Sequence, residues 1–173
     1  VTTPAGTIIH TGDFKLDPSP LNRNVTDYAR LSALGEQGVL ALFSDSTNSE
    51  RPGFTPSETH VRRHIEQIFY SCRSKIIVAC FASSIHRIQI ILDLARDFGR
   101  RVIPVGRSMK ENIAIASDLG YLNIPAGVLA DIADSRMLAD SEQVILSTGS
   151  QGEPLAALTR LAFGKHKDFA VQE

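Results

Sequence analysis

Five short apolar runs constrain the fold of this chain more than any other feature of its sequence. Each run is aliphatic or β-branched and leads into a turn rich in Gly, Ser or Asp. The runs occupy residues 7–10, 39–43, 75–81, 101–106 and 143–147. Their hydrophobicity is continuous rather than alternating, which is typical of strands buried on both faces, as in a parallel sheet. They therefore predict a largely parallel sheet, with residues 128–131 as a weaker sixth strand.

Amphipathic helical patterns fill the gaps between these runs. Ser57 is suited to cap the amides at the start of one helix, and Gly99 and Gly120 follow the ends of two others. The helices are predicted over residues 28–38, 57–72, 84–98, 108–119 and 154–163. Strands that alternate with helices at this spacing form βαβ units, and right-handed crossovers then give a layered α/β fold. A stretch dense in turn-forming residues, 44–56, predicts a hinge and a domain boundary near residue 48.

Composition excludes several classes of protein. Of the 173 residues, 43 % are hydrophobic and 21 % are charged, which is ordinary for a globular chain and excludes a disordered or coiled-coil one. No apolar run is long enough to span a membrane. The formal net charge is −1, so any nucleic-acid contact must come from a local patch rather than from the overall field. The candidate patch consists of Arg87, Arg100, Arg101, Arg107 and Lys110.

The cysteines and the first residues bear on where the chain belongs. Cys72 and Cys80 do not form a C-x-x-C pair, which argues against a disulfide-stapled domain and against a zinc knuckle. We expect both thiols to be reduced, as in the cytoplasm. The chain begins Val-Thr-Thr-Pro without a Met, so we expect an excerpt from a longer protein.

Two carboxylates follow predicted strands directly and are candidates for catalysis. Asp13 lies in HTGDFK after the first run, and its two oxygens can each bind one cation. Asp45 lies in SDSTN after the second run, among hydroxyls and an amide that can hold a metal-bound water or orient a ligand. For both residues the alternative is an Asp that stabilises a turn through local amides.

Three loops follow the remaining strands, at residues 82–87, 106–109 and 147–154. Ligands of parallel sheets bind outside the carboxyl ends of the strands, where helix N-termini favour anions. Arg87 and Arg107 add charged donors suited to phosphate. The last loop, STGSQGEP, is neither a P-loop nor a GxGxxG fingerprint, so a phosphate-rich ligand and ordinary loop chemistry both stay open.

Taken together, HTGDFK, LFSDSTNSERPGFTPSE, ACFASSIHR, VGRSM and ILSTGSQGEP resemble the ribonuclease J family. That family comprises metallo-β-lactamase-fold nucleases with an inserted β-CASP domain. The resemblance implies a site with two metal ions, usually zinc with other divalent metals as an alternative, that hydrolyses RNA by 5′-to-3′ exonuclease and endonuclease action. It matches Asp13 to the bridging metal ligand and Asp45 to a carboxylate that supports the metal site. The substrate-binding residues that we expect are Ser46, Thr47, Asn48, Ser83, His86, Arg87, Arg107, Gly149, Ser150 and Gln151.

The chain also departs from the family pattern. The family's main ligand cluster, H-x-H-x-D-H, and its C-terminal histidine motifs are absent. The resemblance therefore implies that residues 1–47 are the C-terminal part of a metallo-β-lactamase catalytic core, a partial αββα segment. Residues 48–173 would then be a Rossmann-like β-CASP domain, incomplete at its C-terminal end. Because one carboxylate cannot replace a whole zinc ligand set, we expect the isolated chain to be inactive.

Two other functions remain open at this stage. One is a Rossmann-like domain that binds a nucleotide or a phosphate, although the fingerprints of such domains are missing. The other is a non-catalytic module for interaction or dimerisation. In the ribonuclease interpretation, the partners are single-stranded RNA, held by an electrostatic groove, and further copies of the parent protein in a homo-oligomer, with no membrane contact.

Overall fold

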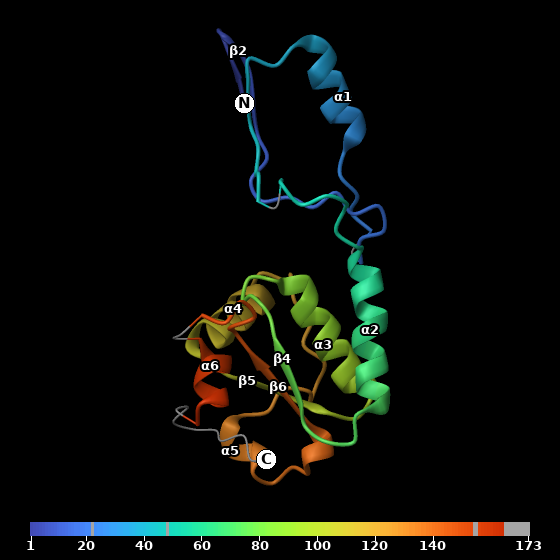
Figure 1. The fold of residues 1–173 in the computed structure, drawn as a ribbon, viewed down its shortest axis with the longest axis vertical. Helices are drawn as coiled ribbons and strands as arrows, with labels where there is room; N and C mark the ends of the chain where they lie inside the picture. Colours follow the sequence, from blue (N-terminus) through green and yellow to red (C-terminus); the bar gives the residue numbers. More distant parts are fainter. Residues whose placement is uncertain (22, 48, 154–155, 165–173) are drawn as a thin grey trace. The chain divides into compact units, whose positions relative to one another are not determined.

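The computed structural model describes residues 1–21, 23–47, 49–153 and 156–164, and its elements are drawn in Figure 1. The chain divides into two compact units, one spanning Val1–Val61 and one beginning at Arg62. The division falls inside helix α2 (Glu58–Ser71), beyond the boundary predicted near residue 48. Compactness does not identify a domain family, so the assignment of residues 1–47 and 48–173 to two families stays a prediction.

The first unit contains a small mixed sheet with strand order β1-β2-β3. Its strands are β1 (Thr2–Thr3), β2 (Gly6–His10) and β3 (Ala41–Phe43). Strand β1 pairs antiparallel with β2, and β2 pairs parallel with β3. Helix α1 (Tyr28–Gln37) lies between β2 and β3 in the sequence, and the Asp27 side chain caps it by accepting a hydrogen bond from the Arg30 amide at 2.8 Å.

The expectation that these strands are buried on both faces is wrong for the first unit. No residue of β2 or β3 is buried, and Leu42 and Phe43 are 61 % and 57 % exposed. The physical reason is that burial requires a covering layer. Helix α1 has no buried residue, so within the described residues it does not cover this sheet.

The second unit is built on a parallel sheet with strand order β4-β6-β5. The strands are β4 (Ile76–Ala79), β5 (Arg101–Pro104) and β6 (Gln143–Ser147). The helices are α3 (Ile85–Asp97), α4 (Arg107–Asp118), α5 (Ile132–Ser135), the short 3-10 helix η1 (Asp140–Glu142) and α6 (Ala157–Ala162). This architecture confirms the predicted α/β fold with a largely parallel sheet.

Several predicted boundaries need correction. Residues 128–131 form no named strand and contribute a single bridge, from Leu129 to Val102. Helix α6 is shorter than the predicted range 154–163, whose first two residues lie outside the described part of the chain. The short helices α5 and η1 were not predicted, because neither is long enough to show an amphipathic period.

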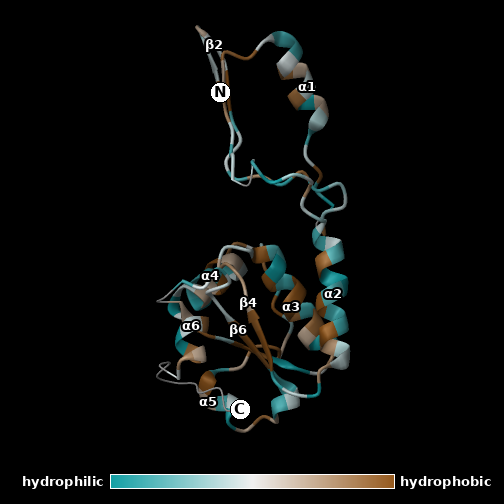
Figure 2. Ribbon diagram, viewed as in Figure 1, coloured by the Kyte–Doolittle hydropathy of each residue, from teal (hydrophilic) through white to brown (hydrophobic). Residues whose placement is uncertain are grey.

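The buried apolar residues of the second unit come chiefly from α3, β5 and β6. All five residues of β6 are buried, and Val144, Ile145 and Leu146 are fully so. Burying three such side chains contributes about 5–9 kcal/mol before the entropy cost of ordering the chain. Figure 2 shows the apolar strands in the middle of this unit and polar faces on the outer sides of its helices.

Helix α3 is buried on more of its circumference than an amphipathic surface helix. The predicted inner face contained Ile85, Ile88, Leu92 and Ala95. The structure buries this face except Ile85, which is half-buried. It also buries Ile90, Ile91 and Leu94, and the helix packs against β5. None of the helices in the described part of the chain combines the length and the apolarity that crossing a membrane requires.

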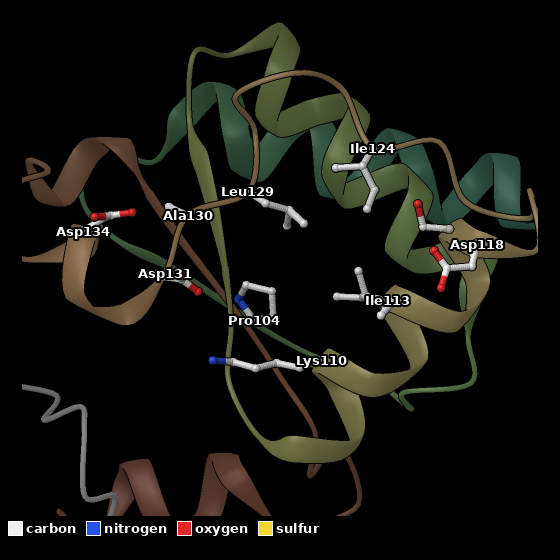
Figure 3. A pocket seen from close by; sticks show the side chains of 11 residues that line it. Pro104, Lys110, Ile113, Asp118, Ile124, Leu129, Ala130, Asp131 and Asp134 are labelled. Carbon is white, nitrogen blue, oxygen red and sulfur yellow. The ribbon is translucent and has the colours of Figure 1, made fainter.

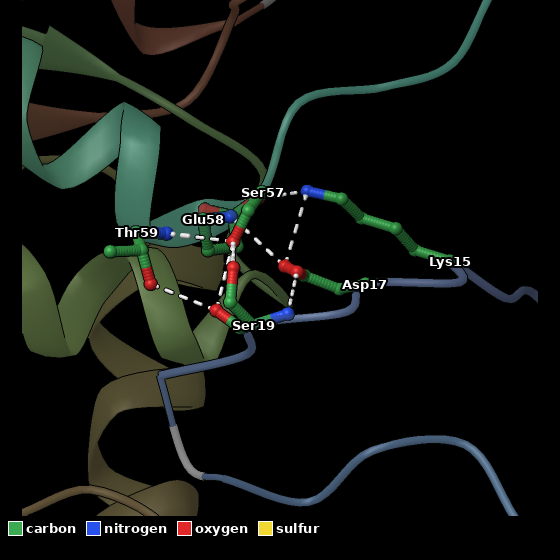
Figure 4. Close-up of polar contacts among 6 residues, drawn as sticks. All are labelled: Lys15, Asp17, Ser19, Ser57, Glu58 and Thr59. Atoms are coloured by element: carbon green, nitrogen blue, oxygen red, sulfur yellow. Dashed lines mark hydrogen bonds and ion pairs between the residues drawn. The ribbon is translucent and has the colours of Figure 1, made fainter.

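The start of α2 is held by a group of polar contacts within the first unit (Figure 4). The Ser57 hydroxyl accepts a hydrogen bond from the Thr59 amide at 3.2 Å, as the cap prediction requires. The Asp17 carboxylate adds a second cap by accepting the Glu58 amide at 3.0 Å. Lys15 donates to the Glu58 carboxylate at 3.0 Å. These bonds fix the segment after HTGDFK against the first turn of α2.

Candidate functional site

The HTGD and SDST loops lie at the same edge of the first unit's sheet. Strands β2 and β3 are parallel, with His10 opposite Phe43, so both loops leave the sheet together. The Thr11 amide donates to the Phe43 carbonyl at 3.0 Å. The Thr11 hydroxyl in turn accepts the Asp45 amide at 3.0 Å. Thr11, which the sequence interpretation passed over, therefore links the loops that carry the two candidate carboxylates.

Asp45 is held in its ionised form by its own turn. Its carboxylate accepts the Thr47 amide at 2.9 Å. Hydrogen bonds from the Thr47 backbone and side chain lower the pKa of Asp45, outweighing the opposite effect of partial burial. Ser46 and Thr47 are exposed beside it, and Asn48 lies outside the described residues. This geometry is the Asx-type turn of the alternative interpretation, and it leaves the Asp45 role in catalysis a prediction.

Asp13 is exposed just beyond the end of β2. Near it, the His10 ring stacks on Phe43 with centroids 6.1 Å apart, and its Nδ1 accepts the Gly12 amide at 3.0 Å. Among the described residues, no three His, Cys, Asp or Glu side chains converge as a metal site would require. These residues therefore do not make up a complete zinc ligand set, and Asp13 offers one carboxylate.

In the second unit, three loops leave the carboxyl ends of the parallel strands. The loop after β4 leads into α3, the loop after β5 leads into α4, and the third follows the central strand β6. The Cys80 amide donates to the Ser147 carbonyl at 3.0 Å, and the Val105 amide donates to the Leu146 carbonyl at 2.8 Å. The backbone hydrogen bonds between the strands thus continue past the strand ends. They hold the loops after β4 and β5 on either side of the loop after β6.

Two glycines allow these loops to approach each other. Gly106 precedes α4 with a φ of 98° and, as a glycine, has no side chain with which to cap the first amides of the helix. Gly149 has a φ of 109°, and a Cβ at this position would lie 2.7 Å from the Cβ of Ala156. No other residue fits at 149 without displacing the start of α6.

The predicted substrate-binding side chains of this unit surround the same edge. Ser83 and His86 are exposed, on the loop before α3 and on its first turn, and Arg87 follows them half-buried. The Arg107 side chain is 91 % exposed at the start of α4. Ser150 and Gln151 are exposed after the buried Gly149. These residues share one side of the sheet because they all follow the carboxyl ends of parallel strands. Their roles in binding substrate stay predictions.

Ser147 is the residue of this edge that the sequence interpretation missed. It ends the central strand, is fully buried, and its hydroxyl has no hydrogen-bond partner within the described residues. A buried hydroxyl without a partner is unfavourable, which makes Ser147 an unusual residue for the end of the central strand. The signal in the sequence is the polar residue that ends an otherwise apolar run.

The predicted basic patch is wrong as a single surface. Arg100 is buried, and its guanidinium donates to the carbonyls of Ser74 at 2.9 Å and of Cys72 at 2.5 Å. Arg101 is the first residue of β5, whereas Arg107 follows the end of the same strand. The two residues therefore lie at opposite ends of β5, with the length of the strand between them.

The fold and the edge define an α/β domain whose loops at the carboxyl ends of a parallel sheet form a candidate anion-binding site. Residues 73–173 match the family described as ribonuclease J, beta-CASP domain. The chain belongs to the ribonuclease J family.

Individual relatives agree along the whole chain. It is 44 % identical over 173 residues to ribonuclease J of Synechocystis sp., and 45 % identical over 171 residues to that of Mycolicibacterium smegmatis. It is 43 % identical over 172 residues to ribonuclease J of Thermus thermophilus. These matches cover 99–100 % of the chain but 27–31 % of the relatives, so the chain spans less than a third of their length.

Proposed function

We propose that this chain is part of a metal-dependent ribonuclease that hydrolyses RNA phosphodiester bonds, with 5′-to-3′ exonuclease and endonuclease action in the longer protein. The family membership supports a nuclease, and the relatives carry the name ribonuclease J. The observation that carries the RNA-binding part is the carboxyl edge of the second sheet. There, α4 begins after Gly106, which has no side chain to cap the helix, and the Arg107 side chain is 91 % exposed beside it.

The role of the second unit is to hold single-stranded RNA by its phosphates. The first amides of α4 point out of the helix at Gly106 and carry the positive end of its dipole. Arg107 adds an exposed positive charge at the same place, 3.9 Å from the Glu111 carboxylate, and Ser83, His86 and Arg87 contribute polar groups from the neighbouring loop. Gly149 allows the third loop, with Ser150 and Gln151, to lie close to this position. The site is local, which agrees with the near-neutral charge of the chain.

The role of the first unit is to supply part of the catalytic centre. Asp13 provides one carboxylate ligand for a pair of divalent ions, proposed to be zinc, and Asp45 supports it from the adjoining loop. The remaining ligands come from parts of the longer protein, because the described residues do not form a ligand set. We infer that the isolated chain does not cleave RNA. Bound zinc in such a centre would activate a water molecule for hydrolysis.

Two further parts of the proposal concern the setting of the protein. Both thiols are free, and burial raises the pKa of Cys80, which keeps that thiol neutral and unreactive. This supports a reducing compartment, for which we propose the cytoplasm. We also propose that the longer protein is a homo-oligomer, which light scattering on it would test.

The RNA-binding proposal is tested with a short single-stranded RNA that carries a 5′-monophosphate. Binding of this RNA to the 173-residue chain should weaken as salt rises, with counterions released for each phosphate contacted. The variant Arg107→Ala should lower the salt slope by about 0.7 and weaken binding about two- to fivefold. Arg136→Ala is the matched control, since Arg136 is exposed next to Ser135, which contacts the opposite end of β6.

Four outcomes would contradict the proposal. Binding that is indifferent to salt excludes phosphate contacts, and equal effects of the two arginine variants exclude the carboxyl edge. Tight binding of a mononucleotide without affinity for RNA would favour a nucleotide-binding domain instead. Zinc-dependent degradation of the RNA by the isolated chain would refute its inferred inactivity.

A further inference from the structure

A groove with a volume of about 450 Å³ opens on the second unit between α4 and residues 124–134. Figure 3 shows Ile113, Ile124 and Leu129 turned toward its interior, with Pro104 at its floor. The groove is distinct from the carboxyl-edge site: of the side chains predicted to contact RNA, only Lys110 of the basic patch lines it, and Ser83, His86 and Arg107 do not. Its apolar floor is wide enough for one large side chain and has no covering residue within the described part of the chain.

The rim of this groove carries an excess of negative charge. Asp118, Asp131 and Asp134 line it together with one cation, Lys110. All four residues are exposed, and none of them forms an ion pair with another described residue. Asp118 is also the last residue of α4, where the helix dipole disfavours a carboxylate. Asp131 and Asp134 lie at the start of the short helix α5, where a carboxylate is favourable, whereas the charge of Asp118 brings no stabilisation that the described chain reveals.

The strand at the floor cannot accept another strand. The outer edge of β5 is already bonded to residues 128–130: the Val102 amide donates to Val128, and the Val102 carbonyl accepts the Ala130 amide. Pro104 lies two residues after Val102, so its backbone faces the same outer side of β5. As a proline, it has no N–H to donate to an added strand. A ligand of this groove is therefore recognised by its side chains and not by added sheet pairing.

We propose that this groove docks a short segment of a partner protein that inserts one aliphatic or aromatic side chain next to an Arg or Lys. The apolar floor fits the inserted side chain, and the carboxylates of Asp118, Asp131 and Asp134 pair with the basic one. RNA is a poor occupant, since its phosphates would meet three carboxylates. This inference does not rest on the proposed nuclease function.

The test uses the 173-residue chain labelled with ¹⁵N and three capped hexapeptides. The probe is Gly-Ser-Leu-Arg-Lys-Gly, and the controls replace Leu by Ser or the two basic residues by Glu. The probe should shift the amide signals of Ala114, Leu129 and Ala130, and each control peptide should bind at least fivefold more weakly. Asp134→Asn should weaken probe binding about two- to fivefold, as for an exposed ion pair. Glu111→Gln, an exposed carboxylate on α4 outside the groove, should leave it unchanged.

A second variant fills the groove without removing a buried side chain. Ala114 is exposed and lines the groove, so Ala114→Phe should abolish probe binding while the remaining amide spectrum is preserved. The inference is overturned if the probe shifts no groove amides, or if it binds Ala114→Phe as well as the original chain. It is also overturned if light scattering shows a dimer that Ala114→Phe dissociates, because the occupant is then a second copy. Loss of RNA binding in Ala114→Phe would overturn it in favour of a nucleic-acid site.

Discussion

Replacing Gly149 by Ala should destabilise the second unit through a collision that the neighbouring helix cannot avoid. A Cβ at 149 would lie 2.7 Å from the Cβ of Ala156 and 3.1 Å from that of Leu158, both attached to backbone near α6. The φ of 109° adds backbone strain of about 1–2 kcal/mol, and overpacking adds about 1–3 kcal/mol. The expected loss in the free energy of unfolding is therefore about 2–5 kcal/mol.

Gly152 supplies a matched control in the same loop. Its φ is 75°, but nothing lies within 4 Å of the position that a Cβ would occupy. Gly152→Ala should therefore show the backbone cost alone, about 1–2 kcal/mol. The difference between the two variants isolates the collision with α6.

Hydrogen exchange at the amides of Ile145 and Leu146 measures this difference. Both residues are fully buried in the central strand, so their amides exchange chiefly when the whole unit opens. Gly149→Ala should accelerate exchange roughly 30- to 3,000-fold, and Gly152→Ala roughly 5- to 30-fold, at about tenfold per 1.4 kcal/mol. Adding Ala156→Gly should recover part of the loss. The reasoning fails if Gly149→Ala exchanges no faster than Gly152→Ala, or if Ala156→Gly recovers nothing.

Three further predictions follow from single contacts. The amide signal of Thr47 should titrate with a midpoint below pH 3.8, because the pKa of Asp45 is lowered. The ionised Asp45 carboxylate stabilises the turn, and this support is lost as the pH falls through that pKa. A midpoint at pH 3.8 or above would contradict this prediction. Burial raises the pKa of Asp17, but hydrogen bonds from the Glu58 amide of α2 and from its own loop outweigh this effect, so the pKa is lowered. Asp17→Asn should therefore speed hydrogen exchange at the first turn of α2. Unchanged exchange would count against the role of Asp17 as a cap. Arg100→Ala should cost about 2–4 kcal/mol in a urea titration, against under about 0.5 kcal/mol for the exposed Arg107→Ala, and equal costs would refute the buried role.

Helix boundaries other than those of α6 were predictable to within a residue or two because their signals are local. The predicted helix over 84–98 became Ile85–Asp97, and the one over 108–119 became Arg107–Asp118. Gly99 and Gly120 follow these helices with positive φ, as a left-handed stop requires. Such signals act within one turn of backbone, so tertiary packing has little chance to override them.

Burial could not be predicted in the same way. The run at 39–43 is as apolar as the run at 143–147, yet Leu42 is 61 % exposed and Ile145 is fully buried. The difference lies in the layers that cover each sheet, and a run of apolar residues does not specify those layers. The apolar pattern therefore identified the strands of both units, but it predicted their burial correctly only in the second unit.

The candidate site was predictable as a set of loops but not as a surface. The strand ends placed Ser83, Arg107 and Gly149 at one edge, because carboxyl ends of parallel strands share an edge. The same reasoning failed for Arg100, since its charge suggested an exposed position and its contacts with two carbonyls and the Phe69 ring bury it. Ser147, whose hydroxyl has no partner among the residues that the structure describes, is buried because β6 is central, and nothing in its own run of residues specifies that order.

The order β4-β6-β5 has a consequence for how the second unit is synthesised. Strands β4 and β5 each pair with β6 and not with each other, so neither can form its ladder until Gln143–Ser147 has been made. At about 5–20 residues per second, the ribosome needs several seconds to pass from Ala79 to Ser147. During that time the edges of two apolar strands are open to other chains. Helices α3 and α4 follow β4 and β5 directly in the chain, so they are the first segments that can shield these strands until the last one arrives.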